Sequence, residues 1–499
     1  MNFLADPAAH GGAAVKRIDT HAASVFLAGT RALKVKRAVK FPFLDYSTLQ
    51  KRKAACAAEI AVNQPFAPAI YRRVLPITRE ADGKLAIAGK GEPIEWALEM
   101  RRFDETATLD HLAEQGRVDG QLADALGRVV AQAHEAAPVA AGFDFNAELD
   151  EIVAQNDGEL RALPALFPTD QVTALTAATQ SSLTRVRPLL ETRRRAGLVR
   201  RCHGDLHLGN IVLIDGAPTL FDAIEFDPDL ATGDVFYDLA FLLMDLLERG
   251  LRAAANAVLN RYLAETRRDS DLDALAALPL FLSVRAAIRA KVSAARGAPD
   301  DARAYFALAQ KLIAPATPRL IAVGGLSGTG KSLLAGMLAP VFDPPPGAVW
   351  LRSDVERKAL FGRRETDRLP EEAYAAEATK KVYAILAAKA RRVVTAGHSV
   401  IIDAVFARPD ERAQIAQAGA PFTGLFLVAD LKTRLSRVGV RTGDASDADA
   451  AIARAQEQYD LGPLDWAAVD ASGTPEQTLQ RAISAVVPAT AAAHTPSRS

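Results

Sequence analysis

The feature that most constrains this chain is a glycine-rich segment, GGLSGTGKS, at residues 324–332. It fits the pattern G-x-x-x-x-G-K-[ST], with a strand-like run, RLIAVG, before it and a helical run, SLLAGMLAPVF, after it. Glycines let backbone N–H groups close around phosphate oxygens, and the helix N-terminus adds favourable partial charge. In this pattern the lysine reaches the β- and γ-phosphates, and the serine holds magnesium. The predicted ATP-binding residues are Gly325, Leu326, Ser327, Gly328, Thr329, Gly330, Lys331 and Ser332, with Lys331 also catalytic and Ser332 also a metal ligand.

Two acids downstream follow strand-like runs. Asp354 comes just after AVWLRS and Asp403 ends SVIID, so both should lie at the carboxyl edge of a sheet, where open α/β folds bind ligands. Asp354 is either a proton acceptor for a substrate hydroxyl or a helix N-cap, and both roles are compatible. Asp403 either supports magnesium through water or is a strand-end turn residue.

Three arginines recur at helical spacing in LKTRLSRVGVR, namely Arg434, Arg437 and Arg441. Cations that close over a transferring phosphoryl group would have this pattern. A solvated basic helix face has the same pattern, so both interpretations stay open.

A second motif, CHGDLHLGN, occupies residues 202–210. In a kinase catalytic loop, an aspartate placed like Asp205 orients or deprotonates the attacking hydroxyl, and an asparagine placed like Asn210 holds magnesium. The next residues read as two strands, IVLI and TLFD, around an Asp-Gly turn, which is a strong hairpin signal. The ends of a hairpin are neighbours, so Asn210 and Asp222 should meet as metal ligands beside Asp205. For His203 we favour a structural role as organiser of this loop.

The pattern of the chain changes after residue 313. Strands alternate with helices around residues 24–100, helical spacing dominates from about 109 to 196, and helices resume after a β-rich piece at 199–226. The segment APATP, residues 314–318, is typical of a linker. Strand–helix alternation then predicts a parallel sheet over 319–487, and residues 488–499 are expected to be a disordered tail.

At these residues the segment 319–487 resembles the small P-loop kinases, whose relatives include gluconate kinase, phage-type polynucleotide kinases, chloramphenicol phosphotransferase and zeta toxins. The resemblance implies that Asp354 is the substrate-side base and that Arg437 and Arg441 belong to a lid. No strand ends in two acids and no arginine-finger signature is identifiable, which favours a phosphotransferase over an AAA-type motor.

The CHGDLHLGN loop resembles that of the aminoglycoside phosphotransferase family, which has a protein-kinase-like fold, over roughly residues 20–313. The resemblance implies an N-terminal lobe (about 20–103) with an ATP-positioning lysine paired with a helix glutamate, and a C-terminal lobe (about 104–313). Lys34 and Lys36 lie on one strand face and are both candidates for that lysine, with Lys34 preferred, and Glu59 is the candidate partner. Glu99–Arg101 would supply backbone contacts in a hinge under the adenine.

This segment also departs from the kinase pattern. It lacks a G-x-G-x-x-G loop, and Asp222 is followed by Ala-Ile instead of Phe-Gly, so the family name describes the fold and not the substrate. The acids of EFDPD bind a cationic substrate or form a solvated turn; they are Glu225, Asp227 and Asp229. Arg285 and Arg289, one helical turn apart, bind an anionic substrate or, as we favour, serve a surface or interlobe role.

Charge and cysteine content limit the remaining functions. Lysine plus arginine equals aspartate plus glutamate at 60 each, so there is no overall field to attract nucleic acid or an anionic membrane. Cys56 and Cys202 are expected to be buried thiols, no signal pattern opens the chain and no apolar run is long enough to span a bilayer, which favours a cytoplasmic protein.

The expected fold is a two-lobed protein-kinase-like domain, residues 1–313, fused to a P-loop domain of α/β class with a parallel sheet. The chain is similar to bacterial proteins described as bifunctional aminoglycoside phosphotransferase/ATP-binding proteins. The expected activity is transfer of the γ-phosphate of Mg-ATP to hydroxyls of small molecules at two sites. Two alternatives remain: a P-loop kinase or ATPase regulated by a non-catalytic kinase-like sensor, and a nucleic-acid end kinase, which neutral charge and sparse aromatics disfavour.

Overall fold

The structure is a computed structural model that describes residues 2–41, 44–419, 421–439 and 445–486. The chain forms two compact units. The first consists of Met1–Ala154 and Leu190–Arg249, and the second of Gln155–Leu189 and Gly250–Ser499. The expected disordered tail, residues 488–499, lies outside the described residues.

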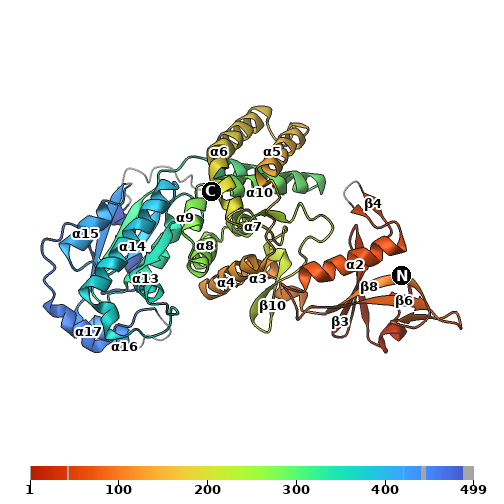
Figure 1. Cartoon of the computed structure of the whole chain (residues 1–499), viewed down its shortest axis with the longest axis horizontal. Coiled ribbons are helices and arrows are strands. Elements are labelled where there is room, and N and C mark those ends of the chain that lie inside the picture. The colour runs from red at the N-terminus through yellow and green to blue at the C-terminus, as the bar shows by residue number, and fades with distance from the viewer. Residues whose placement is uncertain (1, 42–43, 420, 440–444, 487–499) are drawn as a thin grey trace, which may run out of the picture. The chain divides into compact units, whose positions relative to one another are not determined.

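The first unit begins with an antiparallel six-stranded sheet in the order β1-β2-β3-β8-β6-β7 (Figure 1). Gly29, with φ of 55°, lies in the tight turn between β2 and β3, because this left-handed conformation costs glycine little. Helix α2 (Leu49–Asn63) packs on β6 and β8 and carries the buried Glu59. The strands are β1 (Val15–Asp19), β2 (Ala23–Ala28), β3 (Arg31–Lys36), β6 (Tyr71–Arg79), β7 (Leu85–Ile87) and β8 (Glu92–Arg101).

Helices and three short strand pairs complete the described part of the first unit, and one of these pairs is β4 (Lys40–Phe41) with β5 (Leu44–Asp45). Strand β10 pairs with β11, and β9 pairs with β12, both antiparallel. Helix α7 is buried almost all round, since twelve consecutive residues from Val235 to Leu246 are buried. The elements are α3 (Leu109–Glu114), α4 (Gly120–Ala136), β9 (Val199–Arg201), β10 (Ile211–Ile214), β11 (Ala217–Leu220), β12 (Thr232–Asp234) and α7 (Val235–Glu248).

The division between the units falls within the helices α5 (Phe145–Arg161) and α6 (Thr169–Arg195). The second unit then contains α8 (Arg252–Thr266), α9 (Asp269–Ala274), α10 (Leu278–Ala295) and α11 (Pro299–Ile313). On α10, Arg285 is buried and the guanidinium of Arg289 lies 5.4 Å from the ring centre of Tyr305.

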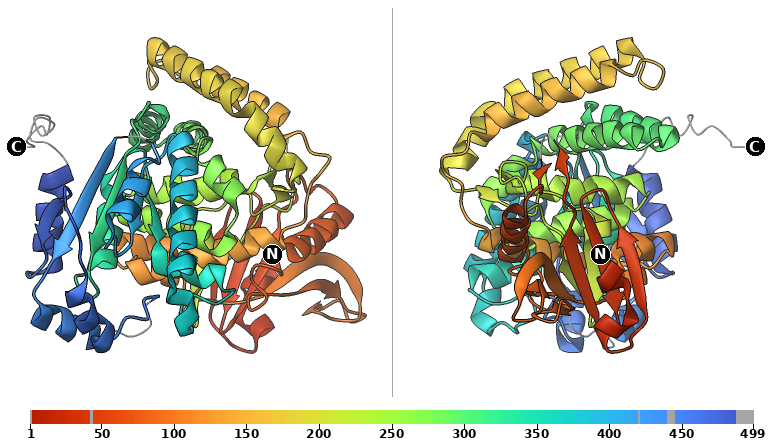
Figure 2. Two further views of the ribbon diagram at one scale, coloured as in Figure 1. Left: turned by 60° about the vertical axis from the view of Figure 1, so that its left-hand side comes forward. Right: turned by 90° about the vertical axis from the view of Figure 1, so that its right-hand side faces the viewer.

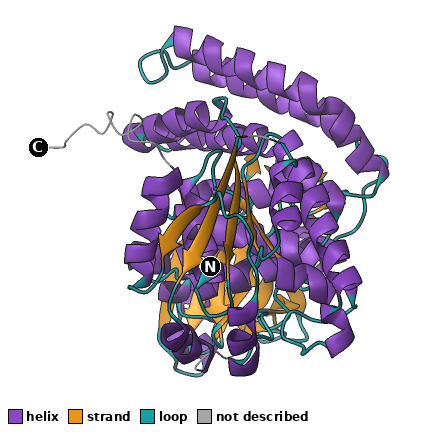
Figure 3. Cartoon of the chain, turned by 90° about the vertical axis from the view of Figure 1, so that its left-hand side faces the viewer, coloured by secondary structure: helices purple, strands orange, loops and turns teal. Residues whose placement is uncertain are grey.

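The rest of the second unit is built on a parallel five-stranded sheet in the order β14-β15-β13-β16-β17, with helices on both faces (Figures 2 and 3). One face packs against α12 (Lys331–Leu338) and α18 (Pro475–Val486), and the core there includes Ile321, Leu338 and Ile401. The remaining helices are α13 (Ser353–Leu360), α14 (Ala376–Thr395), α15 (Pro409–Ala416), α16 (Leu431–Gly439) and α17 (Ala450–Ala455). The strands are β13 (Leu320–Gly325), β14 (Val349–Arg352), β15 (Val400–Asp403), β16 (Phe422–Val428) and β17 (Ala467–Asp470).

The predicted fold class is confirmed: a kinase-like segment precedes a P-loop segment with a parallel sheet. Among the described residues, no helix is long and apolar enough to cross a membrane.

Candidate active sites

The β10–β11 hairpin brings Asn210 next to the segment that carries Asp222. Ile211 is opposite Leu220 in the ladder, and the N–H of Phe221 donates to the carbonyl of Asn210 at 2.9 Å. The turn residues Asp215 and Gly216 have φ of 52° and 83°, the left-handed conformations that an Asp-Gly hairpin turn needs. The predicted hairpin and its Asp-Gly turn are therefore confirmed, but the second strand ends at Leu220, so Asp222 lies two residues beyond it and not at its end.

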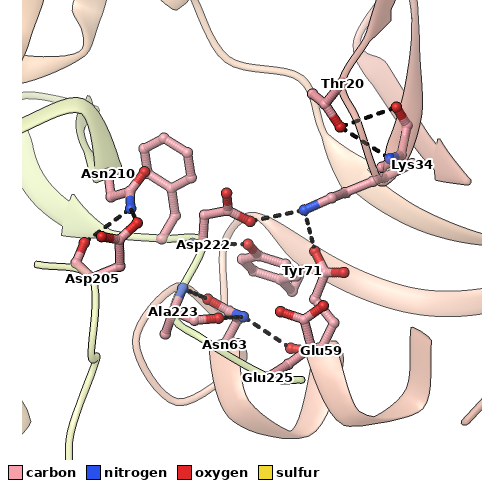
Figure 4. A network of polar contacts seen from close by, with 12 residues as sticks. Thr20, Lys34, Glu59, Asn63, Tyr71, Asp205, Asn210, Asp222, Ala223 and Glu225 are labelled. Carbon is pink, nitrogen blue, oxygen red and sulfur yellow. Dashed lines mark hydrogen bonds and ion pairs between the residues drawn. The ribbon is translucent and has the colours of Figure 1, made fainter. Parts of the chain in front are cut away.

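Asp205 and Asn210 are hydrogen-bonded to each other within the loop (Figure 4). Asn210 Nδ2 donates to Asp205 Oδ2 at 3.0 Å and to the backbone carbonyl of Asp205 at 2.9 Å. These bonds orient the amide group, whose oxygen has the hard-donor chemistry that magnesium prefers.

Lys34 connects the sheet of the first unit to this loop. Its Nζ lies 2.8 Å from Glu59 Oε1 and 2.8 Å from Asp222 Oδ1 (Figure 4). Burial disfavours the ammonium, but the carboxylates of Asp222 and Glu59 raise the pKa of Lys34 well above its ordinary value. The Lys34 charge in turn lowers the pKa of Asp222. Lysine, helix glutamate and hairpin aspartate thus form one charged cluster.

Lys36 belongs to the same cluster but has a different second partner. Its Nζ lies 2.5 Å from Glu59 Oε2 and 2.6 Å from Glu225 Oε1, and the Tyr46 hydroxyl also donates to Glu225 at 3.1 Å. Both predicted lysines therefore contact Glu59. Glu225, for which a solvated turn was one interpretation, is instead buried in this network.

Asp238, on α7, forms hydrogen bonds with the backbone of the 202–210 loop. Its carboxylate accepts the backbone N–H groups of Gly204 at 2.9 Å and His203 at 3.3 Å. Burial lowers the pKa of His203, so the imidazole is neutral and donates from Nε2 to the carbonyl of Phe221 at 2.9 Å. His203 thus ties the catalytic-type loop to the hairpin.

Both cysteines are buried. Among the described residues, the ligand atoms of His134, Cys202 and Asp238 all lie within 4.8 Å of one another. His134 Nε2 lies 3.1 Å from an oxygen of Asp238, so imidazole and carboxylate are engaged with each other beneath the loop.

Two residues that the sequence reasoning missed complete the first site. Asn63 brackets the backbone after Asp222: its Oδ1 accepts the N–H of Ala223 at 2.7 Å and its Nδ2 donates to the carbonyl of Ala223 at 3.2 Å. The Tyr71 hydroxyl accepts the N–H of Asp222 at 3.1 Å. Asn63 follows Glu59 by four positions on α2, so a second polar residue on the buried helix face was the available signal.

Much of the predicted hinge uses its backbone groups within the sheet. Glu99 and Met100 pair with β3 on one side and β6 on the other, and the N–H of Arg101 donates to the carbonyl of Ile70 at 2.8 Å. A central strand uses its backbone groups in the ladder, which engages Glu99, Met100 and the N–H of Arg101 within the sheet. Adenine contacts from the rest of this stretch stay a prediction.

The glycine-rich loop of the second unit links β13 to α12, as predicted. Gly328 and Gly330 have φ of 85° and 90°, and a Cβ on Gly328 would lie 2.5 Å from the carbonyl oxygen of Arg434. Lys331 Nζ donates to the carbonyl of Leu326 at 3.2 Å, folded over the loop. A hollow of about 360 Å³ adjoins the loop, and its lining is Gly328, Thr329, Gly330, Ser332, Leu333, Leu334, Met337, Arg437, Pro475 and Thr478.

Asp403 lies at the carboxyl edge of the sheet, beside Ser332. It is opposite Val323 of β13 and Arg352 of β14 in the parallel ladders. Burial raises the pKa of Asp403, while Lys331, Arg352 and a hydrogen bond from Ser332 act in the opposite direction. A carboxylate and a hydroxyl meet here beside two cations, a donor set suited to magnesium and phosphate.

Asp354 lies in the first turn of α13 and is not its N-cap. The N-cap position is held by Arg352, without a side-chain capping bond. The N-cap interpretation of Asp354 is therefore wrong, although a carboxylate in a first helical turn still gains from the helix dipole. Asp354 also helps to raise the pKa of Asp403, which places the two acids near each other.

The three arginines at helical spacing, of which Arg437 and Arg441 were expected in a lid, have different surroundings. Arg434 is buried and supports the glycine-rich loop: Nε donates to the carbonyl of Ser327 at 2.8 Å, and the guanidinium also pairs with Glu457. Arg437 lines the hollow and donates to the carbonyl of Gly473 at 3.1 Å. Arg441 lies outside the described residues.

Gln456 is a further loop support that the sequence did not indicate. Its Oε1 accepts the N–H of Ser327 at 2.6 Å, and its side chain is buried. Gln456 and Arg434 together hold both backbone groups of Ser327.

A kinase-like fold with a lysine–glutamate–aspartate cluster, joined to a P-loop domain, is the architecture of a phosphotransferase. The sequence model of the phosphotransferase enzyme family matches residues 22–278, more than half of the chain, and that of an AAA domain matches residues 320–461. The chain belongs to this phosphotransferase enzyme family.

One relative matches along almost the whole length. The uncharacterized protein Rv2004c of Mycobacterium tuberculosis is 30% identical over 487 residues, which cover 93% of this chain and 94% of the relative. Both segments therefore recur together in that relative.

Solved structures similar to parts of the chain include two kinases. A choline/ethanolamine kinase family protein from Mesorhizobium loti covers 62% of this chain and 92% of its own, with 16% identity and a TM-score of 0.39. A sugar kinase from Janibacter sp. covers 36% of this chain and 99% of its own, with 21% identity and a TM-score of 0.27.

Proposed function

We propose that this chain is an ATP-dependent kinase with two nucleotide sites, each of which transfers the γ-phosphate of ATP to the hydroxyl of a small molecule. The observation that carries the proposal is the meeting of Lys34 on β3 and Glu59 on α2 with Asp222, which follows the hairpin far along the sequence. Such clusters of charge are costly to bury and recur where phosphates and metal ions bind.

In the first site, Lys34 would bind ATP phosphates, and Asn210 and Asp222 would hold Mg²⁺. The metal, when bound, neutralises charge on the phosphates. Asp205 accepts the proton of the acceptor hydroxyl while that oxygen forms the new bond to phosphorus and ADP leaves. The Asn210–Asp205 hydrogen bond holds the carboxylate in place for this step.

In the second site, Lys331 and the N–H groups of the loop would bind the phosphates, and Ser332 with Asp403 would hold Mg²⁺. Asp354 is the proposed base, and Arg437, in the wall of the hollow, is a proposed contact for the nucleotide. The lid role of Arg441 stays part of this proposal.

The acceptors proposed for both sites are small molecules and not nucleic acids or membranes. The charge balance of 60 basic and 60 acidic residues supports this choice. Use of ATP and two buried thiols are typical of the cytoplasm, which we propose as the location.

The test is transfer of labelled phosphate from ATP into a metabolite extract by wild type, Asp205→Asn and Lys331→Ala. We expect each substitution to remove a different labelled product. Matched controls are Asp215→Asn, in the exposed hairpin turn, and Lys380→Ala, paired with Glu377 on the surface of α14, which should leave both products. If Lys331→Ala removes all labelling and Asp205→Asn none, the first site is a non-catalytic sensor.

A further inference from the structure

Helix α8 covers the open edge of the parallel sheet. β14 is an edge strand, so one row of its backbone groups has no strand partner. Asn260 Oδ1 accepts the N–H of Trp350 at 2.6 Å, and the Nδ2 groups of Asn256 and Asn260 donate to the carbonyl of Ala348 at 3.0 and 3.2 Å. Two amides one helical turn apart thus replace a neighbouring strand.

The same helix starts a line of charged side chains that ends at Asp403, the acid beside Ser332. Arg261 Nη1 lies 2.7 Å from Glu365 Oε2, and Glu365 Oε1 lies 3.5 Å from Arg352 Nη1. Arg352 Nε lies 3.8 Å from Asp403 Oδ2. The exposed fractions of the Arg261, Glu365 and Arg352 side chains are 16, 24 and 14%, so the line is largely screened from water.

Arg352 occupies the edge of the sheet where the second site lies. It is the last residue of β14, opposite Asp403 and two positions before Asp354. Its guanidinium is 4.8 Å from the ring centre of Trp350, and that ring is near Gly336 of α12. Arg352 therefore lies on the α12 face, where Ser332 and Lys331 also act on Asp403.

The chemistry of a guanidinium suits both ends of this line. It has five N–H donors in a fixed plane, so one edge can bind Glu365 while another is presented to phosphoryl oxygens. A cation aimed at the transferred group stabilises charge that develops in the transition state. Glu365, held by Arg261, limits the directions in which Arg352 can point.

We propose that Arg352 is a catalytic residue of the second site that contacts the transferred phosphoryl group, and that Arg261 of α8 positions it through Glu365. The proposal rests on the proposed kinase function of that site. Helix α8 lies within residues 22–278, the part that matches the phosphotransferase enzyme family. The kinase-like segment thus supplies Arg261, a positioning residue of the P-loop site. This gives a physical reason why the kinase-like and P-loop segments occur in one chain.

The experiment uses the full chain carrying Asp205→Asn, which silences the first site, with Mg-ATP as the probe and water as acceptor. Phosphate release gives kcat and KM, and calorimetric titration gives ATP affinity. Arg352→Ala should lower kcat about 100-fold or more, with a smaller change in ATP affinity. Arg261→Ala should lower kcat about 10-fold, and Arg261→Lys should restore part of that loss.

A double-substitution cycle tests whether Arg261 acts through Arg352. In the Arg352→Ala background, Arg261→Ala should have no further effect on kcat, because coupled residues are not additive. The matched control is Arg252→Ala. Arg252 also lies on α8, but it contacts Phe342 and Asp343 and does not belong to the line of charged side chains. Its substitution should leave kcat unchanged.

Three results would overturn the proposal. Normal kcat in Arg352→Ala removes the catalytic role. Equal losses of kcat in Arg261→Ala and Arg252→Ala, or additive losses of kcat in the double-substitution cycle, would show that α8 only supports the fold and does not position Arg352. All three results are compatible with the proposed kinase function, whereas unchanged phosphate release in Lys331→Ala would refute the proposed function itself.

Discussion

Lys34 and Lys36 show that the position of a lysine along a strand selects its ion-pair partners. They are two positions apart on β3, so the pleat puts both on the same face, and both contact Glu59. Only Lys34 pairs with Asp222, while Lys36 pairs with Glu225. The proposed role in ATP binding therefore goes to Lys34, and Lys36 stabilises the segment that follows Asp222.

Substitution of the two lysines should separate these roles. Lys34→Met should lower the Asp205-dependent kcat/KM about 100-fold or more, because the phosphates lose their cation. Lys36→Met should keep turnover within about 10-fold but lower the free energy of unfolding by about 3 kcal/mol, since it leaves buried carboxylates without their partner. Steady-state kinetics and urea unfolding measure both effects. A larger kinetic loss in Lys36→Met would reverse the assignment.

At the scale of elements, short connections decide where the functional groups meet. The hairpin turn of β10 and β11 brings Asn210 to Asp222, and α7 holds the loop through Asp238. In the second unit, parallel pairing puts the ends of β14 and β15 side by side, which brings Arg352 opposite Asp403. These positions follow from the register in which the strands pair, and few residues of a particular type are needed to produce them.

A histidine two residues before β15 should make the second unit sensitive to acid. His398 is fully buried and donates from Nε2 to the carbonyl of Gly347 at 2.8 Å. Burial lowers the pKa of His398 from 6.5 to about 4. Between these pH values the unfolded chain binds a proton that the folded chain does not, so stability falls as pH falls, by about 3 kcal/mol in all.

The measurement is urea unfolding between pH 7 and 4.5, followed by tryptophan fluorescence. A Trp96→Phe background leaves Trp350 and Trp466, both in the second unit, as reporters. His398→Asn should flatten the dependence of unfolding free energy on pH while lowering stability at pH 7. Parallel pH curves for the two proteins would contradict the assignment.

At the scale of the whole molecule, the boundary between compact units differs from the boundary between family matches. Residues 250–313 precede the linker, yet they belong to the unit that contains the parallel sheet. Contacts between α8 and β14 and between α9 and α14, where Arg392 pairs with Asp273, account for this grouping.

A cut at the linker should therefore harm the P-loop segment. The fragment 314–499 lacks the amides that cover β14, whereas the fragment 250–499 keeps them. Three lost hydrogen bonds at about 1 kcal/mol each should lower the Tm of the shorter fragment by about 5–10 °C. Calorimetry of the two fragments gives their Tm values. Equal Tm values would show that the contact between α8 and β14 adds no stability.

Several features were determined by the sequence alone. The glycine-rich loop between β13 and α12, the Asp-Gly hairpin and the alternation of strands and helices follow from backbone sterics within a few residues. The acids of both sites could be proposed because each motif fixes its own local geometry. The sequence could not show which of Lys34 and Lys36 pairs with Asp222, because both side chains lie on the same face of β3.

Tertiary structure decided the contacts between residues that are distant along the chain. The Lys34–Asp222 pair, the burial of Arg434 under the loop and the line from Arg261 to Asp403 each join segments with no local relation. Periodicity places a side chain on a face of its own element, but only packing of elements selects its partner. For that reason the glycine-rich loop and the CHGDLHLGN loop could be recognised in the sequence, whereas the helix that covers β14 could be identified only from the fold.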